Sequence, residues 1–511
     1  MTTTENNKRI AKNTLMLYFR MILTMLVSLY TSRVILNTLG VEDYGTYAIV
    51  GGIVGMFGIF NGAMAGATQR FLSFELGRKN YVQLRKTFNA AQIIHISIAL
   101  LVLVLAETVG LWLIVNYLKI PDGRMEAALW VYHFSMLSFM VSIVQAPYNA
   151  VIIAREQMNV YAYVSILEVL LKLVIVFMLT WIAFDKLKLY GILVFAVTII
   201  IAVIYRIYTR RNFEETKFEA VKDKALYKTL VSYSGWNLWG NLASVTKAQG
   251  VSIILNIFFG TVVNAALGIA NQIYTAINSF VMNFQIASNP QIVKSYASNN
   301  KEYMNGLVIR ISKFSFYLLF VLSLPVVLEI DYILELWLKI VPEHTAIFAI
   351  LVLMNALIDT ISGPLMISLQ ATGKIKVYQS VVGIMLILIL PISYLLFKLG
   401  FSPQSTFVVS ICIAILAFLV RLYLTKKEIP EFSVGMFVQD VLLRSLPIVI
   451  LAICIPFLIK LTMNAGFVRF AVVSVVSVLS SLMLIYFFGL KKNEKLFLQK
   501  AISTFIIKIK R

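Results

Sequence analysis

The sequence predicts an all-α protein that crosses a membrane about fourteen times, and three observations lead to this prediction. Of its 511 residues, 60% are hydrophobic and only 14% are charged, and the mean hydropathy is +0.85. Apolar runs of about 20 residues, long enough to cross a hydrocarbon core of about 30 Å, recur along the whole length. A sequence pattern also occurs twice, which predicts two parallel-related six-helix lobes followed by two C-terminal helices.

The predicted helices follow one another closely, because only short polar intervals separate the apolar runs. They cover residues 13–36, 45–70, 88–117, 127–154, 159–184, 190–208, 230–258, 262–289, 306–330, 345–370, 377–397, 405–423, 441–462 and 467–490. We expect an N-lobe in residues 1–220, a C-lobe in residues 221–430, and helices 13 and 14 with a basic tail in residues 431–511.

The basic residues indicate the topology. The net charge is +21, and Lys and Arg gather in alternate intervals, chiefly residues 70–86, 206–228 and 491–511. Positive charge concentrates on the cytoplasmic side of membrane proteins, so we expect both termini in the cytoplasm. Topology then accounts for the charge, which argues against a nucleic-acid partner and for contact with anionic membrane lipids. The first span follows a basic leader without a small-residue cleavage site, so we expect a retained helix.

The duplication is visible in several short motifs. The run Ile35-Leu36-Asn37-Thr38-Leu39-Gly40 returns as Ile254-Leu255-Asn256-Ile257-Phe258-Phe259-Gly260. Pro147, Ala154 and Val160-Tyr161 return at one constant spacing as Pro364, Ala371 and Val377-Tyr378. An even number of spans separates the copies, so both halves have one orientation. This layout is typical of transporters whose halves move around a central site, and a duplicated scaffold is the alternative.

Cations within the repeated element are the first candidate site residues. Arg20 and Arg33 lie in the first span and Lys247 in the seventh, where a charge is costly and usually faces a pathway or cavity. Arg20 shares a helix face with other polar residues, whereas Arg33 lies on a different face near the outer end, where reaching to the interface is an alternative role. Lys247 lies near the middle of its span, on a stripe with Asn237, and is the strongest candidate.

The eighth span carries the clearest polar stripe. Its members recur at alternating spacings of three and four, which places them on one helix face: Asn271, Thr275, Asn278, Met282, Gln285 and Asn289. Amides both donate and accept hydrogen bonds, so this face suits sugar hydroxyls, and bonding to neighbouring helices is the alternative. The equivalent face of the second span is rich in glycine.

Three further charged residues are candidates for coupling transport to an ion gradient. Glu168 and Lys172 have the spacing of an ion pair within one helix, which is structural in the alternative reading. Asp359, beside Asn355, has no cation on its own helix face and is the best candidate for a proton or Na⁺ carboxylate.

Catalytic and cofactor motifs do not occur in the sequence. It contains no His-Glu-x-x-His, no Cys-x-x-Cys and no phosphate-binding Gly-x-x-x-x-Gly-Lys-Ser/Thr loop. We therefore expect a protein that is not an enzyme, has no cofactor or metal, and transports passively or on an H⁺ or Na⁺ gradient.

Several motifs together resemble a known family. They are Arg33-Val34-Ile35-Leu36 with Leu39-Gly40, Tyr44-Gly45-Thr46-Tyr47, Gln69-Arg70-Phe71, Gln249-Gly250 with Asn256, and Glu335-Leu336-Trp337-Leu338 with Val341-Pro342-Glu343. The chain resembles the bacterial polysaccharide and O-antigen flippases of the multidrug/oligosaccharidyl-lipid/polysaccharide exporter superfamily over nearly its whole length.

The resemblance implies two lobes around a central cationic cleft in the bacterial inner membrane. There a lipid-linked oligosaccharide, on undecaprenyl diphosphate, is flipped to the outer leaflet by alternating access, with polysaccharide assembly proteins as partners. Lys247, Arg20 and Arg33 would then hold the diphosphate, and Asn271, Thr275, Asn278, Gln285 and Asn237 the glycan.

Three other functions stay open. A cation-coupled multidrug antiporter of the same superfamily is the main rival, although such proteins commonly carry an acid in the first span and none lies in residues 13–41 here. A membrane glycan polymerase or ligase usually needs a long outward catalytic loop, which the sequence does not contain. A structural scaffold is the third.

Overall fold

The computed structural model describes residues 3–39, 41–117, 120, 123–338 and 341–496, with some side chains within these ranges left out. The described residues form helices and no strand, as the composition predicts. They divide into two compact units. Unit 1 comprises Met1–Ala243, Ile286–Asn300 and Gln370–Gly383, and unit 2 comprises Ser244–Gln285, Lys301–Leu369 and Ile384–Arg511.

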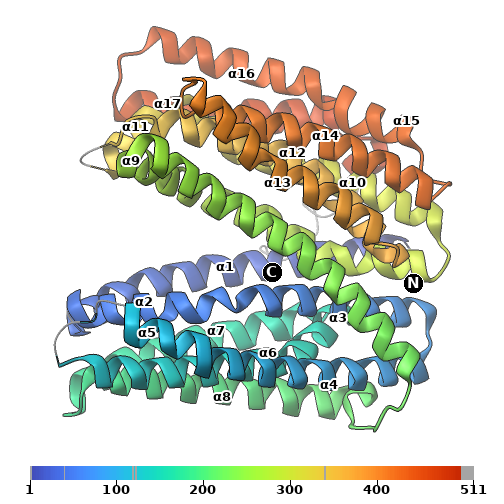
Figure 1. The fold of residues 1–511 in the computed structure, drawn as a ribbon. Helices are drawn as coiled ribbons and strands as arrows, with labels where there is room; N and C mark the ends of the chain where they lie inside the picture. The colour runs from blue at the N-terminus through green and yellow to red at the C-terminus, as the bar shows by residue number, and fades with distance from the viewer. Residues whose placement is uncertain (1–2, 40, 118–119, 121–122, 339–340, 497–511) are drawn as a thin grey trace, which may run out of the picture. The chain divides into compact units, whose positions relative to one another are not determined.

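Among the described residues, eight helices precede the linker at residues 213–223, and Figure 1 shows them running alongside one another. They are α1 (Thr3–Leu39), α2 (Val41–Met56), α3 (Gly58–Arg78), α4 (Tyr81–Leu105), α5 (Leu111–Tyr117), α6 (Met125–Ala154), α7 (Met158–Trp181) and α8 (Lys186–Asn212). One π-helical turn, Ala106–Gly110, joins α4 to α5, and one 3-10 turn, Glu214–Thr216, lies in the linker.

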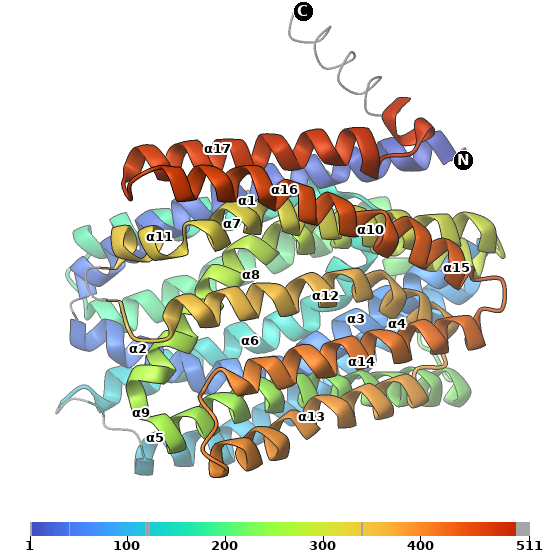
Figure 2. The same ribbon diagram turned by 90° about the horizontal axis from the view of Figure 1, so that it is seen from above.

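Nine helices follow the linker in the part of the chain that the structure describes. They are α9 (Lys224–Ala297), α10 (Lys301–Leu328), α11 (Ile330–Trp337), α12 (Thr345–Thr372), α13 (Lys376–Lys398), α14 (Ser405–Glu428), α15 (Val434–Phe437), α16 (Ser445–Thr462) and α17 (Phe467–Leu484). Figure 2 shows α16 and α17 next to each other, and these two helices also pack together by contact. Two π-helical segments, Val438–Leu443 and Ile485–Gly489, flank them.

Twelve helices of the described chain are long and apolar enough to cross a membrane, which makes this a multi-pass membrane protein. The two predicted spans without such a counterpart are residues 45–70 and 262–289. The first is divided at Phe57 into α2 and α3, and α2 has only 16 residues. The second is the amide-rich part of α9. Both spans carry the glycines or amides of their polar stripes, which lower the hydropathy of the helix.

The long helix α9 is two helices joined at Gly260. This residue has φ 80° and ψ −169°, a backbone conformation that is essentially restricted to glycine. The break separates the predicted seventh and eighth spans at the position that the repeated motif indicates. The preceding copy has its helix boundary at the same place, since α1 ends at Leu39 and α2 begins at Val41.

The duplication is also visible in how helices end. Lys79 after α3 and Asn299 after α9 both have left-handed backbones, and their amides bond to Leu76 O and Tyr296 O in the same pattern. The turns after α6 and α12 correspond in the same way, with Glu156 (φ 60°) in one and Gly373 (φ 80°) in the other. Each of these two helices also contains its predicted proline. Backbone geometry thus confirms the two copies.

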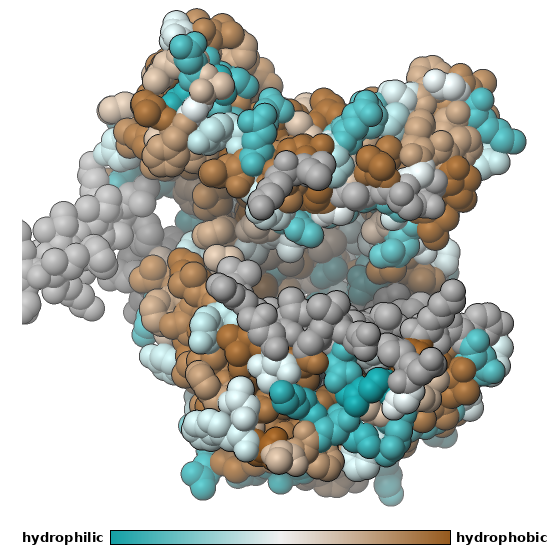
Figure 3. Space-filling model, turned by 90° about the vertical axis from the view of Figure 1, so that its left-hand side faces the viewer, coloured by the Kyte–Doolittle hydropathy of each residue, from teal (hydrophilic) through white to brown (hydrophobic). Residues whose placement is uncertain are grey.

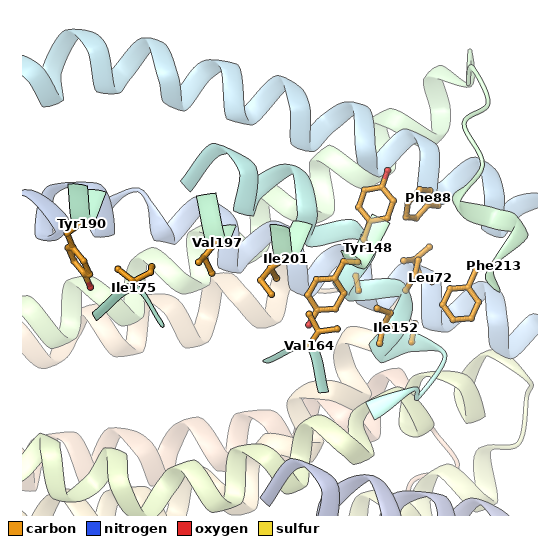
Figure 4. Packing of buried hydrophobic residues seen from close by; sticks show 14 of the residues in the cluster. Leu72, Phe88, Tyr148, Ile152, Val164, Ile175, Tyr190, Val197, Ile201 and Phe213 are labelled. Atoms are coloured by element: carbon orange, nitrogen blue, oxygen red, sulfur yellow. The ribbon is translucent and has the colours of Figure 1, made fainter. Parts of the chain in front are cut away.

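Each unit has its own apolar interior. In unit 1, Figure 4 shows a cluster in which Leu72, Phe88 and Tyr148 come from α3, α4 and α6. The rings of Phe88 and Tyr148 meet edge to face at 5.3 Å. In unit 2, Phe348 of α12 and Phe407 of α14 pack at 4.5 Å within a similar cluster.

Figure 3 looks onto the helix ends near α11 and shows teal, hydrophilic side chains among brown, hydrophobic ones.

An ion-pair cluster joins three helices of unit 1 at the predicted outer ends. Arg124 Nε donates to Asp43 Oδ1 at 2.7 Å and its Nη1 donates to Asp185 Oδ2 at 2.6 Å. Asp185 also caps α8 by accepting from the amides of Leu187 and Lys188. Burial alone would raise the pKa of Asp185, but the hydrogen bonds from Arg124 and these amides outweigh it, so its pKa is lowered. The cluster fixes α2 and α8 on the start of α6.

Candidate functional site

Unit 2 contains a group of charged side chains within its membrane-spanning helices. Asp359 of α12 lies 3.9 Å from Arg421 Nη1 of α14 and accepts a 2.8 Å hydrogen bond from Asn355 Nδ2. Lys247, in the first part of α9, is attracted by Asp359 and repelled by Arg421. The cluster thus combines two cations with one carboxylate.

Some buried polar atoms of this cluster have no hydrogen-bond partner among the described residues. The side chain of Asp359 is 48% exposed, whereas that of Arg421 is only 11% exposed. Arg421 Nε and Asn355 Oδ1 are buried and have no hydrogen-bond partner among the described residues. Buried polar atoms are normally paired, so unpaired ones beside an exposed carboxylate indicate a place where water, an ion or a polar ligand binds.

Two members of this cluster, Lys247 and Asp359, were candidates from the sequence, and Arg421 was not. Arg421 was one of the basic residues that set the topology, but α14 continues to Glu428, two turns further, and its guanidinium points back to Asp359. The run Val420-Arg421-Leu422-Tyr423 that closes the twelfth predicted span is matched by Tyr205-Arg206-Ile207-Tyr208, which closes the sixth, and Arg206 is exposed. The position of Arg421 well inside the helix end was the signal that could have identified it.

The two ends of the polar stripe on the second part of α9 differ in exposure. Asn271, Thr275 and Met282 are exposed and Asn278 is partly buried, while Thr275 Oγ1 donates to the backbone O of Asn271 at 2.7 Å. Tyr274, next to Thr275, interacts electrostatically with Asp359, so this stretch lies near the charged cluster.

The other end of the stripe packs against neighbouring helices. Gln285 Nε2 donates to Ser315 Oγ of α10 at 3.2 Å and lies against Gly363 of α12. Gln285 therefore has the interhelical role that the sequence left as an alternative, whereas Asn271, at the other end of the stripe, is exposed.

Asn237 has its hydrogen-bond partner within unit 1. It is 8% exposed, and its Oδ1 accepts a 3.1 Å hydrogen bond from Gln379 Nε2 of α13. It belongs to unit 1, whereas Lys247 belongs to unit 2, so the division of the chain between Ala243 and Ser244 cuts the predicted stripe. Asn237 thus links α9 to α13 by a side-chain hydrogen bond.

In unit 1, Arg20 of α1 lies over the ring of Tyr161 of α7, with 4.8 Å between the guanidinium carbon and the ring centroid. Such cation–π contacts are favourable inside proteins. Glu168 and Lys172 form the expected ion pair at 2.7 Å, and each is about two-fifths exposed. The side chain of Arg33 lies outside the described residues.

A buried carboxylate that the sequence reading did not predict lies at the turn between α6 and α7. The side chain of Glu156 is 0% exposed and pairs with Arg9 Nε at 3.1 Å and with Lys294 Nζ. Gln291 Nε2 donates to it at 2.7 Å, and Asn13 Nδ2 donates to its backbone O at 3.1 Å. Residues from the two copies of the repeat therefore meet at this turn inside unit 1.

The equivalent turn of the second copy has a matching arrangement. Arg70 of α3 donates from Nε to Gln370 O at 2.9 Å and from Nη2 to Ala371 O at 2.6 Å. The first copy thus holds the turn of the second through Arg70, and the second holds the turn of the first through Lys294. This reciprocity explains why residues 286–300 and 370–383 cluster with unit 1.

No group of three or more His, Cys, Asp or Glu side chains within the described ranges is arranged to hold a metal ion. The charged cluster has a single carboxylate, which lies beside two cations. What it can bind by charge is an anion at Lys247 and Arg421, or a proton or monovalent cation at Asp359.

No model of a known protein family matches the chain, and a search of curated proteins gives no match. Solved structures do match. One is an outward-facing multidrug resistance transporter of the MATE family in the MOP superfamily, with a TM-score of 0.70 and 10% identity over 84% of this chain and 97% of that one. Another is the MATE transporter ClbM in complex with Rb⁺, with a TM-score of 0.69 and 16% identity over 81% and 94%.

A third match is a MOP superfamily transporter from Pyrococcus furiosus, for which a binding pocket of reversed polarity suggests a different function. Its TM-score is 0.66 and its identity 11%, over 84% of this chain and 96% of that one. These matches confirm the predicted fold class, because the chain has the two-lobed, all-helical fold of MATE transporters.

Proposed function

We propose that this chain is a secondary transporter that moves an anionic, lipid-linked oligosaccharide across the bacterial cytoplasmic membrane by alternating access. The single observation that supports this cargo is the excess of positive charge in the cluster of Lys247, Asp359 and Arg421. A cation inside a membrane helix is expensive, and two of them beside one acid suit a diphosphate. The exposed amide of Asn271 and the hydroxyl of Thr275, on the neighbouring stretch of α9, suit sugar hydroxyls.

A cation-coupled multidrug antiporter is the second candidate, and the comparisons favour it over the first. The matched structures include multidrug transporters of the MATE family and one complex with Rb⁺. Asp359, about half exposed, is a carboxylate that can take up a proton or Na⁺. The likeness rests on 10% and 16% identity and concerns the fold, so we rank the two functions by the charges of this chain.

Reconstitution in liposomes distinguishes the two candidates. The purified chain is tested with a synthetic undecaprenyl diphosphate carrying a short fluorescent oligosaccharide, and separately with ethidium under an imposed H⁺ or Na⁺ gradient. We expect the wild type to flip the glycolipid and the variant Lys247→Ala/Arg421→Ala to lose at least tenfold in rate, about 1.4 kcal/mol.

Arg206→Ala is the matched control, because it removes the exposed repeat equivalent of Arg421. It should leave the flipping rate unchanged. Gradient-driven ethidium export without glycolipid movement, lost in Asp359→Asn but kept in Lys247→Ala/Arg421→Ala, would establish the antiporter instead.

A further inference from the structure

An apolar groove in unit 1 lies between α3, α4 and the first part of α9. It has a volume of about 420 Å³ and an almost wholly apolar lining, which includes Met64, Ile94, Leu101, Val231 and Leu238. The three helices that form it lie together in Figure 1, with α9 in green beside α3 and α4 in blue. Val231 is 54% exposed and Leu101 is 52% exposed, so the groove opens on the surface of the unit.

The groove face of α9 continues into lysines. Tyr227, Val231 and Leu238 line the groove at spacings that define one helix face. Lys224 lies beyond Tyr227 towards the start of the helix, close to this face, and Lys228 lies at its edge, one turn before Val231; both lysines are exposed. Lys224 lies three residues before Tyr227, about 4.5 Å along the helix, which is within reach of a lysine side chain.

The groove face of α4 continues in the same way. Ile93 and Ile94 line the groove, and Lys86 lies two turns before Ile93 on the same side of the helix. In the described part of the chain, Lys86, Lys224 and Lys228 take part in no ion pair of 4.0 Å or less, whereas the nearby Arg85 is paired with Glu219 at 2.8 Å. Among the described acids of the adjoining linker, Glu214 pairs with Lys217, Glu215 pairs with Arg155, and Asp223 caps α9.

We propose that this groove is a binding site for an anionic bilayer phospholipid, with an acyl chain in the groove and the phosphate on Lys86, Lys224 and Lys228. An apolar channel that ends in unpaired cations has the polarity of such a lipid along its length. Basic residues at a membrane surface attract anionic headgroups, and buried methylenes add affinity for the chain. The site lies wholly within unit 1 and is independent of the cargo proposed above.

The test measures lipid binding to the purified full chain by native mass spectrometry, with dioleoyl phosphatidylglycerol and dioleoyl phosphatidylcholine as probes. We expect the wild-type protein to bind phosphatidylglycerol in preference to phosphatidylcholine. The variant Lys224→Ala/Lys228→Ala should lose roughly tenfold in that preference. Arg210→Ala/Arg211→Ala is the control, since it removes two exposed cations outside the groove face and should keep the preference.

A second variant tests whether the groove binds the acyl chain of the lipid. Gly235 lies in the groove, and a Cβ there meets nothing within 4 Å, so Gly235→Phe fills the groove from an open position. It should weaken binding of both lipids while the lysines are intact. If this variant does not fold, Lys224→Ala/Lys228→Ala still tests the proposed lipid site.

Three results would overturn the proposal. One is equal binding of the two lipids by the wild type, and another is an equal loss in the Arg210→Ala/Arg211→Ala control. The third is displacement of phosphatidylglycerol by equimolar undecaprenyl phosphate, because the groove would then hold a carrier lipid.

Discussion

Arg421 Nη1 and Asp359 Oδ1 lie 3.9 Å apart, on helices α14 and α12 of unit 2. The distance is long for a structural ion pair, and the carboxylate is 48% exposed. Exposed pairs contribute little to stability. The pair is therefore better suited to binding than to holding the helices together.

Replacing Asp359 by Asn should leave stability almost unchanged and impair transport. We expect a change in the free energy of unfolding below about 1 kcal/mol, because the carboxylate is half exposed and its ion pair with Arg421 is long. The transport rate of whichever substrate is carried should fall at least tenfold, about 1.4 kcal/mol. Thermal unfolding in detergent and the liposome assay measure the two effects. Asp331→Asn, which neutralises an exposed acid of α11, should change neither.

Replacing Glu156 by Ala should destabilise unit 1 strongly. The change leaves Lys294 and Arg9 without their buried partner, and breaking a buried pair in this way costs about 3–5 kcal/mol. The matched control is Glu126→Ala, which removes an acid that pairs with Lys188 and is 74% exposed. That pair should contribute less than about 1 kcal/mol. Equal unfolding temperatures for the two variants would contradict the role of Glu156.

Replacing Gly260 by Ala should cost stability through the backbone alone. A Cβ at this position meets nothing within 4 Å, but φ is 80° and such a conformation costs a non-glycine residue about 1–3 kcal/mol. Gly268→Ala in the same helix also has open space and has no positive φ. It should be neutral or stabilising, since alanine favours helix by about 1 kcal/mol over glycine. Destabilisation of both variants to the same extent would refute the argument.

The pairing of Asp185 with Arg124 predicts a dependence on pH. The pKa of Asp185 is lowered in the folded state, so its contribution to stability is present above the unfolded pKa, about 3.8 to 3.9, and is lost as pH falls through the lower folded value. Asp185→Asn keeps a residue that caps helices well but removes the charge. The variant should be less stable than the wild type at pH 7, and the difference should disappear in acid. A difference independent of pH from 7 to 2.5 would argue against the ion pair.

Much of the fold could be predicted from the sequence, because each helix depends on its own apolar run and the duplication repeats local motifs. The break at Gly260 and the prolines of α6 and α12 lie where the repeat indicated. The expected domain limits at residues 220 and 430 stay predictions. The two units follow different limits, because the end of α9 and the turn at residues 370–373 contact elements of the first copy.

The candidate site was only partly predictable. Lys247 and Asp359 were recognisable because a charge in the middle of an apolar run is unusual. Arg421 was not recognised, because its sequence pattern groups it with the cations of the helix end, and only its distance of two turns from the end of α14 sets it apart. The pairing of Glu156 with Lys294 joins residues far apart in the chain, and no local pattern indicates such a contact.

The turns at Glu156 and Gly373 have the same backbone conformation in the two copies but carry different side chains. Both copies keep the same left-handed corner, and one occupies it with glycine, which adopts that conformation without strain. The other copy tolerates a glutamate there and gains an anchor for three donors from two other helices. Both turns contact the other copy, one through Arg70 and the other through Lys294, but only the turn at Glu156 does so with a buried side-chain charge of its own.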